Sequence, residues 1–201
     1  MVIPPASPTA DRWLDTHPQG LWSTLGNEQK RERILNAAGR LFARDGLEVP
    51  MPAVAAEAGA GIGSLYRQFP SKRDLLAALV IRRLLQIQAA AVEAAASPGD
   101  HWQAMKEMLQ VTVERHAADD FLGQAWTQVE GHEHVRVVAD ATTEAFARLV
   151  ELARAEGGIR ADATAFDIRL LFAATRASRQ LHPDAWRRVL ELMLDGLATR
   201  R

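Results

Sequence analysis

From residue 27 onward, apolar residues recur at helical spacing, and glycine or proline interrupts each run. The first stripe follows the i, i+1, i+4, i+7, i+8 spacing of an amphipathic helix and consists of Ile34, Leu35, Ala38, Leu41 and Phe42. No segment shows a convincing alternation of apolar and polar residues, which is the pattern of a half-buried strand. We therefore predict an all-α fold in which helices bury their apolar stripes against one another.

Glycine, proline and capping residues give the expected ends of the helices. Asn27 is expected to cap the first helix and Gly46 to end it, while Ser71 is expected to cap the longest one. The predicted helices cover residues 28–45, 53–58, 63–69, 71–96, 100–118, 119–129, 132–156, 163–181 and 184–199.

Three segments follow from this punctuation: an N-terminal arm (1–27), a helix-turn-helix domain (28–75) and a larger helical domain (76–201). The arm contains four prolines, which argue against a long helix, although a short helical turn near residues 11–15 is possible. Trp13 and Trp22 each offer a large apolar area, so we expect the arm to pack on the body of the protein.

The composition excludes several classes of protein. The 201 residues contain no cysteine, so the chain has neither disulfides nor thiolate-bound metal. No apolar run approaches the ~18 residues of a membrane span. The N-terminus also lacks the basic and apolar regions of a secretory signal. We therefore expect a cytoplasmic protein without a membrane partner.

Catalytic and metal-binding patterns are not evident in the sequence. There is no defensible Ser-His-Asp arrangement, phosphate-cradling glycine loop or pair of carboxylates, so we expect neither an enzyme nor a cofactor. His132 and His134 would point about 200° apart on one helix, so they would share a metal only if the chain were not helical there. His116 and Asp119 have suitable spacing but no evident third ligand. We expect no metal site.

Residues 53–69 read as two short helices joined by the turn "AGAG", which is the helix-turn-helix arrangement. In this motif the second helix can lie in the major groove of DNA. Residues 28–75 carry eight Lys and Arg against six Asp and Glu, so a few placed contacts would have to carry DNA binding. The expected core of the motif consists of Leu41, Phe42, Val54, Ala55, Ala58, Ile62, Leu65 and Phe69, although Ile62 is also a candidate for the DNA-facing side.

The stretch Arg31–Val80 resembles the DNA-binding domain of the TetR/AcrR family of transcriptional regulators. The resemblance is carried by "ILNAAGRLF", "AGAGIGSLYRQF" and "SKRDLL", which occur in the family's order and spacing. It implies that Tyr66 and Lys72 contact DNA phosphates. It also implies that the recognition helix presents Ile62, Gly63, Ser64, Arg67 and Gln68 to bases or flanking phosphates.

Three departures from the family pattern leave the operator sequence open. Met51 and Pro52 stand where a serine or threonine usually opens the second helix, so one hydroxyl–phosphate contact is expected to be lost. Gly61 replaces the usual serine cap of the recognition helix, and Ile62 replaces a polar residue. These departures keep open an alternative function, a helical small-molecule-binding protein whose DNA-binding head has weakened or decayed.

The resemblance implies that the larger domain binds a small-molecule effector and forms a homodimer. Aromatic, methionine and polar residues of the central helices are either a mainly apolar effector pocket or plain core: Trp102, Met105, Met108, Thr112, His116, Phe121, Trp126, Thr142 and Phe146. The last two helices carry stripes that fit a dimer face or an intramolecular core: Ile168, Leu171, Phe172, Trp186, Val189, Leu190, Met193 and Leu197. We expect a ligand-responsive regulator that binds double-stranded DNA, most simply a repressor.

Overall fold

The computed structural model describes residues 22, 25–118 and 121–199, and gives the backbone alone for residues 116–118, 121 and 122. Within these ranges the secondary structure consists of helices joined by loops, and there is no strand. One isolated antiparallel bridge joins Ile159 and Ala198. The all-α prediction is confirmed. The chain divides into two compact units, residues 1–76 and 77–201.

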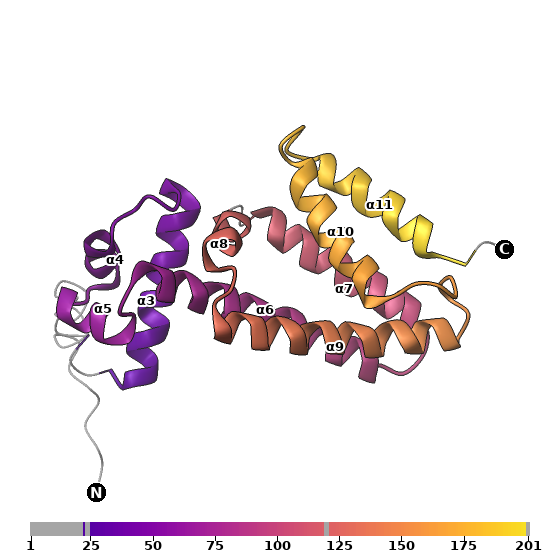
Figure 1. Cartoon of the computed structure of the whole chain (residues 1–201), viewed down its shortest axis with the longest axis horizontal. Helices are drawn as coiled ribbons and strands as arrows, with labels where there is room; N and C mark the ends of the chain where they lie inside the picture. Colours follow the sequence, from indigo (N-terminus) through magenta and orange to yellow (C-terminus); the bar gives the residue numbers. More distant parts are fainter. Residues whose placement is uncertain (1–21, 23–24, 119–120, 200–201) are drawn as a thin grey trace, which may run out of the picture. The chain divides into compact units, whose positions relative to one another are not determined.

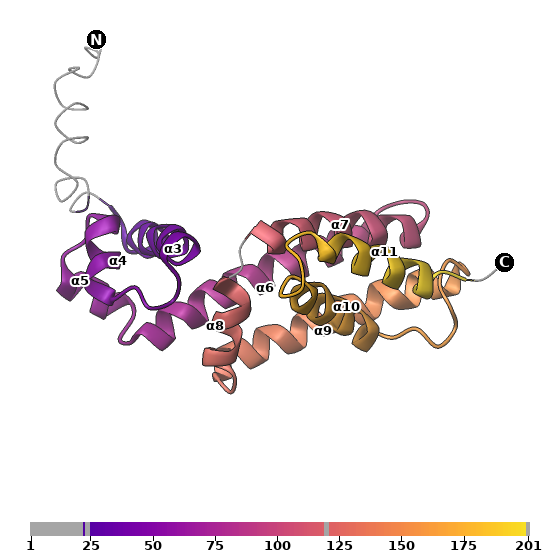
Figure 2. The same ribbon diagram turned by 90° about the horizontal axis from the view of Figure 1, so that it is seen from above.

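The first unit contains α3 (Asn27–Asp45), α4 (Met51–Ala58), α5 (Ile62–Gln68) and the start of α6 (Lys72–Ala96). In Figures 1 and 2, α4 lies beside α3, and α5 follows α4 after a short turn. The N-cap of α3 is Gly26, one residue earlier than predicted. Asn27 does not act as the cap, and its Oδ1 instead accepts a hydrogen bond of 2.5 Å from Nε2 of Gln68.

The core of the first unit is the predicted one with a single exception. Seven of the side chains expected there are buried: Leu41, Phe42, Val54, Ala55, Ala58, Leu65 and Phe69. Ile62, which the sequence left open between the core and the DNA-facing side, lies outside this core, since 45% of it is exposed. It is the first residue of α5, one turn before Tyr66, and both side chains lie on the exposed side of the helix. Trp22 is buried as expected, whereas Trp13 and the predicted turn at 11–15 lie outside the described residues.

Glycine is required at the turn between α4 and α5. Gly59 ends α4 in the left-handed region, with φ 65° and ψ 27°, where an L side chain is strained. The N–H of Ala60 donates to the carbonyl of Ala55 at 2.8 Å, which is the six-to-one bond of a Schellman motif. This geometry ends α4 within one residue and lets α5 start at Ile62.

The long helix α6 begins with a reciprocal cap at Ser71. Oγ of Ser71 accepts a hydrogen bond of 3.2 Å from the N–H of Asp74, and Oδ2 of Asp74 accepts one of 2.9 Å from the N–H of Ser71. By length and composition alone, α6 is apolar enough to cross a membrane. This is weak evidence, because Leu75, Leu79 and Ile87 are buried within the protein, as in the core helix of a globular domain.

The second unit contains the rest of α6 and five further helices. These are α7 (His101–Ala118), α8 (Phe121–Val129), α9 (Glu133–Ala155), α10 (Ala165–Ser178) and α11 (Ala185–Leu197). The last two helices form an antiparallel hairpin, and α7 and α9 also pack against α10 (Figure 1). The buried core runs between these helices and includes Met105, Leu109, Leu149, Ile168 and Leu171.

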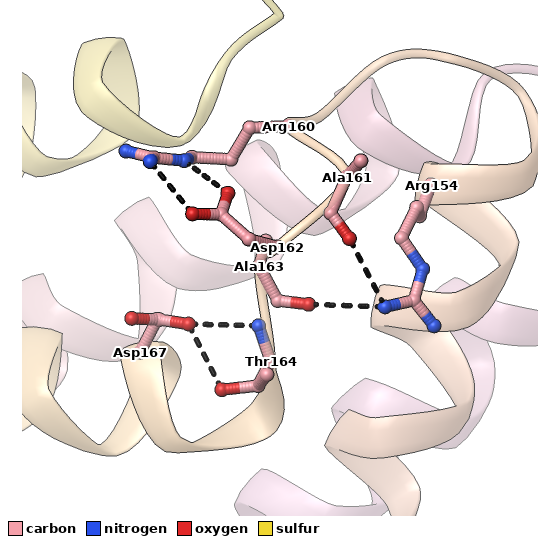
Figure 3. A network of polar contacts seen from close by, with 7 residues as sticks. All are labelled: Arg154, Arg160, Ala161, Asp162, Ala163, Thr164 and Asp167. Carbon is pink, nitrogen blue, oxygen red and sulfur yellow. Dashed lines mark hydrogen bonds and ion pairs between the residues drawn. The ribbon is translucent and has the colours of Figure 1, made fainter.

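Polar contacts fix the loop between α9 and α10 (Figure 3). Oδ2 of Asp167 accepts hydrogen bonds from the backbone N–H and the hydroxyl of Thr164, at 2.7 and 2.9 Å, so α10 starts two residues later than predicted. Arg160 contacts both carboxylate oxygens of Asp162, and this hydrogen bonding lowers the pKa of the Asp162 carboxyl. Nη1 of Arg154 lies 3.4 Å from the carbonyl oxygens of Ala161 and Ala163.

The start of this loop is also tied to α7 and to the segment that follows α11. Oε2 of Glu156 accepts a hydrogen bond of 2.9 Å from the N–H of His101, at the start of α7. This bond, together with the His101 ring, lowers the pKa of the Glu156 carboxyl, so its contribution to stability is lost as the pH falls through that pKa. Gly158 lies against Trp102, and its carbonyl accepts a hydrogen bond of 3.3 Å from the N–H of Thr199.

Candidate functional site

The first candidate site is the exposed face of α5. Buried apolar residues on the opposite face hold the helix in place. Leu65 and Phe69 are 0% and 1% exposed, and they fix α5 to the core of the first unit. Ile62 and Tyr66 are each 45% exposed, and Gly63 and Arg67 are exposed beside them. The exposed face of α5 therefore consists of the apolar side chain of Ile62, the backbone at Gly63, the phenol of Tyr66 and the guanidinium of Arg67.

Three polar side chains of α5, those of Ser64, Arg67 and Gln68, have hydrogen-bond partners. Nη2 of Arg67 donates a hydrogen bond of 2.7 Å to Oγ of Ser64, one turn earlier on the same helix. Gln68 is half-buried and joins the end of α5 to Asn27 at the start of α3. Of the residues expected to read DNA, Arg67 and Ser64 thus form one linked pair, and Gln68 also braces two helices against each other.

Tyr66 and Lys72, the two expected phosphate contacts, make no hydrogen bond or ion pair with any described residue. The phenol of Tyr66 is exposed. Lys72 is half-buried, and its Nζ lies 5.9 Å from the centroid of the Phe42 ring, so the aromatic ring supports the side chain while the ammonium keeps its donors. Both groups can therefore donate to an oxyanion that approaches the first unit.

Two arginines near this face have structural partners. Nε of Arg33 donates a hydrogen bond of 2.8 Å to the carbonyl of Ala58, which is one of the terminal acceptors of α4. The guanidinium of Arg31 lies 4.4 Å from the centroid of the Phe69 ring. These contacts show that both side chains stabilise the motif itself.

The departures from the family pattern have a simple structural basis. Met51 is the first residue of α4, and it is buried, so it contributes to the core in place of a surface hydroxyl. Gly61 has extended backbone at the N-cap of α5, and a Cβ placed there would meet nothing within 4 Å. The structure therefore has room for a serine side chain at position 61.

The second candidate site is a cavity of about 340 Å³ in the second unit. Its apolar wall comes from several helices and includes Leu84, Ile87, Val113, Phe146 and Trp186. The volume is near the lower end of the roughly 300–1,000 Å³ typical of small-molecule sites. A mainly apolar interior of this size can enclose a compact organic ligand.

The sequence identified only part of this cavity. Of the predicted pocket residues, Trp126, Thr142 and Phe146 line it. Met108 and Thr112 line a second hollow between α6 and α7 instead. Trp102 and Met105 are buried in the hydrophobic core and line neither cavity, because that end of α7 packs inward. His116 and Phe121 are outside the residues whose side chains the structure describes.

The cavity also contains residues that sequence reasoning missed. The cavity is also lined by Arg83 of α6, by Arg169 and Arg176 of α10, by Arg179 at the C-cap of α10, and by Asp140. The only signal in the sequence was the spacing of Arg169, Arg176 and Arg179, which are seven and three residues apart and so share one face of a predicted helix. The sequence predicted a mainly apolar pocket, and these charged residues were not part of that prediction.

The residues predicted for a dimer interface are largely used within the single chain. Ile168, Leu171, Trp186, Leu190 and Leu197 are buried, and Phe172, Val189 and Met193 are half-buried. This burial is what the alternative, an intramolecular core, requires. The exposed apolar side chains of the same two helices are Phe166, Leu170 and Leu192, at 59%, 44% and 52% exposure. Homodimerisation stays a prediction.

The histidines at the start of α9 are closer together than helical geometry allows. His132 is the N-cap of α9 and has extended backbone, so its ring centroid lies 5.6 Å from that of His134. The chain is therefore not helical at His132, which is the condition under which the two rings could approach each other. Across the described residues, no group of three His, Asp or Glu side chains could hold a metal ion.

Comparison with known proteins identifies the family. Residues 34–79 match the family model "Bacterial regulatory proteins, tetR family". Residues 97–199, more than half of the chain, match the model "Transcriptional regulator SbtR-like, C-terminal domain". The chain belongs to the TetR family of transcriptional regulators. Both the first and the second unit therefore carry family matches, and the resemblance of Arg31–Val80 is confirmed.

Individual TetR-family relatives support the same assignment. The HTH-type transcriptional repressor KstR of Mycolicibacterium smegmatis is 40% identical over 91 residues, which are 43% of this chain and 45% of the relative. The matched stretch thus spans less than half the length of that curated protein.

Two solved structures extend the similarity over most of the chain. The TetR transcriptional regulator SCO0520 from Streptomyces coelicolor is 27% identical, with a TM-score of 0.64, over 85% of this chain and 99% of that one. A TetR transcription regulatory protein from Mycobacterium vanbaalenii is 30% identical, with a TM-score of 0.58, over 85% of this chain and 96% of that one. The TetR-family fold thus accounts for both units.

Proposed function

We propose that this protein is a DNA-binding transcriptional repressor that acts in the cytoplasm and leaves its operator when a small molecule fills the cavity. The observation that carries the proposal is the exposed face of α5, with Tyr66 and Lys72 available to an oxyanion. An intact, buried helix-turn-helix core favours a working DNA-binding head over a decayed one. The names of the KstR relatives support repression as the sign of regulation.

Phosphate contacts and base contacts have different roles in this proposal. Tyr66 and Lys72 donate to the DNA backbone and set the register of α5, while Ile62, Ser64 and Arg67 face the bases. A guanidinium at Arg67 suits the O6 and N7 acceptors of guanine, and the methyl groups of Ile62 suit a thymine methyl. Gly63 leaves the backbone bare, so the helix can approach the duplex closely.

The helix α6 supplies the coupling between effector and operator. Its first residue is Lys72, and Val80, Arg83, Leu84 and Ile87 of the same helix line the cavity. A ligand that favours a different position of α6 would move Lys72 away from its phosphate. The effector and the operator DNA would then favour different conformations of the protein. Such a difference in affinity is the thermodynamic requirement for release of the DNA.

Two chains bind one operator in this proposal, since a single helix-turn-helix reads too few base pairs for specificity. The exposed apolar residues Phe166, Leu170 and Leu192 of α10 and α11 are available for the contact between subunits. A dimer related by a two-fold axis would place the two recognition helices on half-sites about 34 Å apart or a multiple of that distance.

Selection of bound duplexes from random DNA, followed by anisotropy titration at fixed salt, tests the proposal. We expect a palindromic site bound by two chains, with a dissociation constant well below ~1 μM and a large margin over random DNA. Failure to recover any preferred sequence, or equal affinity for selected and random duplexes, would refute the repressor function.

Replacing Gly63 by alanine should separate stability from DNA binding. A Cβ at this position would lie 3.6 Å from Nη1 of Arg67, an ordinary contact, and alanine favours the helix by up to about 1 kcal/mol. The methyl group would nevertheless project from the proposed DNA-facing surface. We expect an unchanged or higher melting temperature together with at least several-fold weaker operator binding. Unchanged affinity would show that the backbone at Gly63 does not approach DNA.

A further inference from the structure

The lining of the cavity has a strong excess of positive charge. It contains four arginines, Arg83, Arg169, Arg176 and Arg179, and one carboxylate, Asp140. Arg169 and Arg176 belong to α10, Arg179 is its C-cap, and Arg83 comes from α6. Arg169 and Arg176 are exposed, whereas Ile87, Val113 and Trp186 of the same cavity are buried. The cavity therefore combines an apolar floor with a basic rim.

The rim is not neutralised at its two exposed arginines. Arg169 makes no hydrogen bond or ion pair with any described residue. Nη1 of Arg176 donates a hydrogen bond of 3.0 Å to the carbonyl of Gly123, a neutral acceptor, and no described carboxylate pairs with it. Both guanidinium groups keep donors and a full positive charge at the mouth of the cavity.

The hydroxyl groups of the floor cannot supply donors to a ligand. Each threonine hydroxyl of the lining donates a hydrogen bond to the backbone carbonyl four residues earlier. The distances are 2.7 Å for Thr142, 2.9 Å for Thr143 and 2.8 Å for Thr175. Each hydroxyl proton is thus used within its own helix, which leaves the threonine methyl groups on the apolar surface. Apart from the two indole N–H groups, the arginines are the donors that a ligand can reach.

A wholly apolar ligand would fit this cavity poorly. If it filled the space out to the rim, it would remove water from the guanidinium groups without replacing the lost hydrogen bonds, which is costly. An apolar body that ends in an anion would bury itself against the floor and place the anion between the arginines. Such an arrangement combines hydrophobic burial with charge-assisted hydrogen bonds.

We propose that the effector of this protein is an amphipathic anion, an apolar body with one carboxylate or phosphate head group, and that Arg169 and Arg176 bind the head group. Arg83 and Arg179 line the same cavity. The inference rests on the proposed function, because it names the class of ligand for the cavity of that function. It concerns binding to the protein alone and does not depend on DNA.

Three probes with the same alkyl chain test the head group: decanoate, decyl phosphate and decan-1-ol. Calorimetric titration of the full chain without DNA gives each affinity, and fluorescence of Trp126 and Trp186, which line the cavity, reports occupancy. We expect at least one anion to bind ten-fold or more tightly than the alcohol, and the tighter of the two identifies the head group. Equal affinities, or no binding by any probe up to its solubility limit, would overturn the proposal.

Matched arginine variants locate the anion. Arg169→Gln should reduce the ratio of anion to alcohol affinity at least five-fold and leave the alcohol unaffected, because glutamine removes the charge and keeps a polar side chain of similar helix propensity. Arg136→Gln removes an exposed arginine of α9 outside the cavity lining and should leave the ratio unchanged. An unchanged ratio in an Arg169→Gln/Arg176→Gln double variant would overturn the proposal. Operator binding without ligand, measured on the same variants, would still test the DNA-binding function separately.

Discussion

Replacement of Lys72 by alanine should weaken binding to every duplex by a similar factor, on the order of 100-fold for a dimer. The estimate assumes that each of two chains loses one charge-assisted contact of about 1.5 kcal/mol. Because a phosphate contact carries no sequence information, affinity for operator and random DNA should fall together. The slope of log affinity against log salt concentration should decrease by about one unit per chain. Anisotropy titrations over a range of salt concentrations measure both quantities.

Lys106 provides a matched control for this substitution. Its Nζ lies 5.5 Å from the centroid of the Trp102 ring, and that of Lys72 lies 5.9 Å from the centroid of Phe42, so both lysines pack against an aromatic side chain. Lys106→Ala makes the same change in net charge within the second unit and should leave the salt slope unchanged. Tyr66→Phe should act like Lys72→Ala with a smaller loss. A variant that altered base preference while keeping affinity for random DNA would contradict the phosphate-contact role.

Replacement of Gly158 by alanine should cost about 1–3 kcal/mol in the free energy of unfolding, as for other overpacked core positions. A Cβ at Gly158 would lie 2.6 Å from Cβ and 3.2 Å from Cγ of Trp102. The Cβ of Trp102 is fixed by the backbone of α7, and its side chain is buried, so no rotation of the tryptophan relieves the overlap. Urea unfolding followed by circular dichroism measures the loss.

Gly123 offers a control with the same overlap and a different neighbour. A Cβ there would lie 2.6 Å from Cδ of Arg176, which belongs to a flexible and exposed side chain that can turn away. Alanine also favours the interior of α8 over glycine by about 1 kcal/mol. We expect Gly123→Ala to stay close to the wild type in stability. If Gly158→Ala were no more destabilising than Gly123→Ala, the packing of Trp102 against the loop would be looser than described.

Local patterns were sufficient to predict the helices and the buried side of α5. Leu65 and Phe69 recur at helical spacing, and the glycines around Ala60 mark the turn, so chain-local information specifies the buried and exposed sides of α5. The N-cap of α3 was misplaced because Asn27 contacts Gln68, a partner forty-one residues away. The exposure of Ile62 was left undecided for the same reason, since apolar character alone does not determine which face a residue occupies.

The cavity depends on contacts that no local pattern contains. Its lining unites Arg83 of α6 with arginines of α10, more than eighty residues later in the chain. Trp102 and Met105 have the composition expected of a pocket, yet tertiary packing turns them into the core. Likewise, the apolar stripes of α10 and α11 were consistent with either a dimer face or a core, and the neighbouring helices bury most of their members.

The hydrogen bond from Arg67 to Ser64 reduces the number of conformations that the recognition surface samples in the free protein. A long arginine side chain that is ordered at an interface otherwise loses about 1.5–2 kcal/mol of rotational entropy. Part of this entropy is therefore lost before the protein binds DNA. The guanidinium of Arg67 then has few other orientations with which it could accommodate a mismatched base pair. Ser64 would in this way sharpen discrimination between operators through Arg67, in addition to the base-facing role proposed for it above.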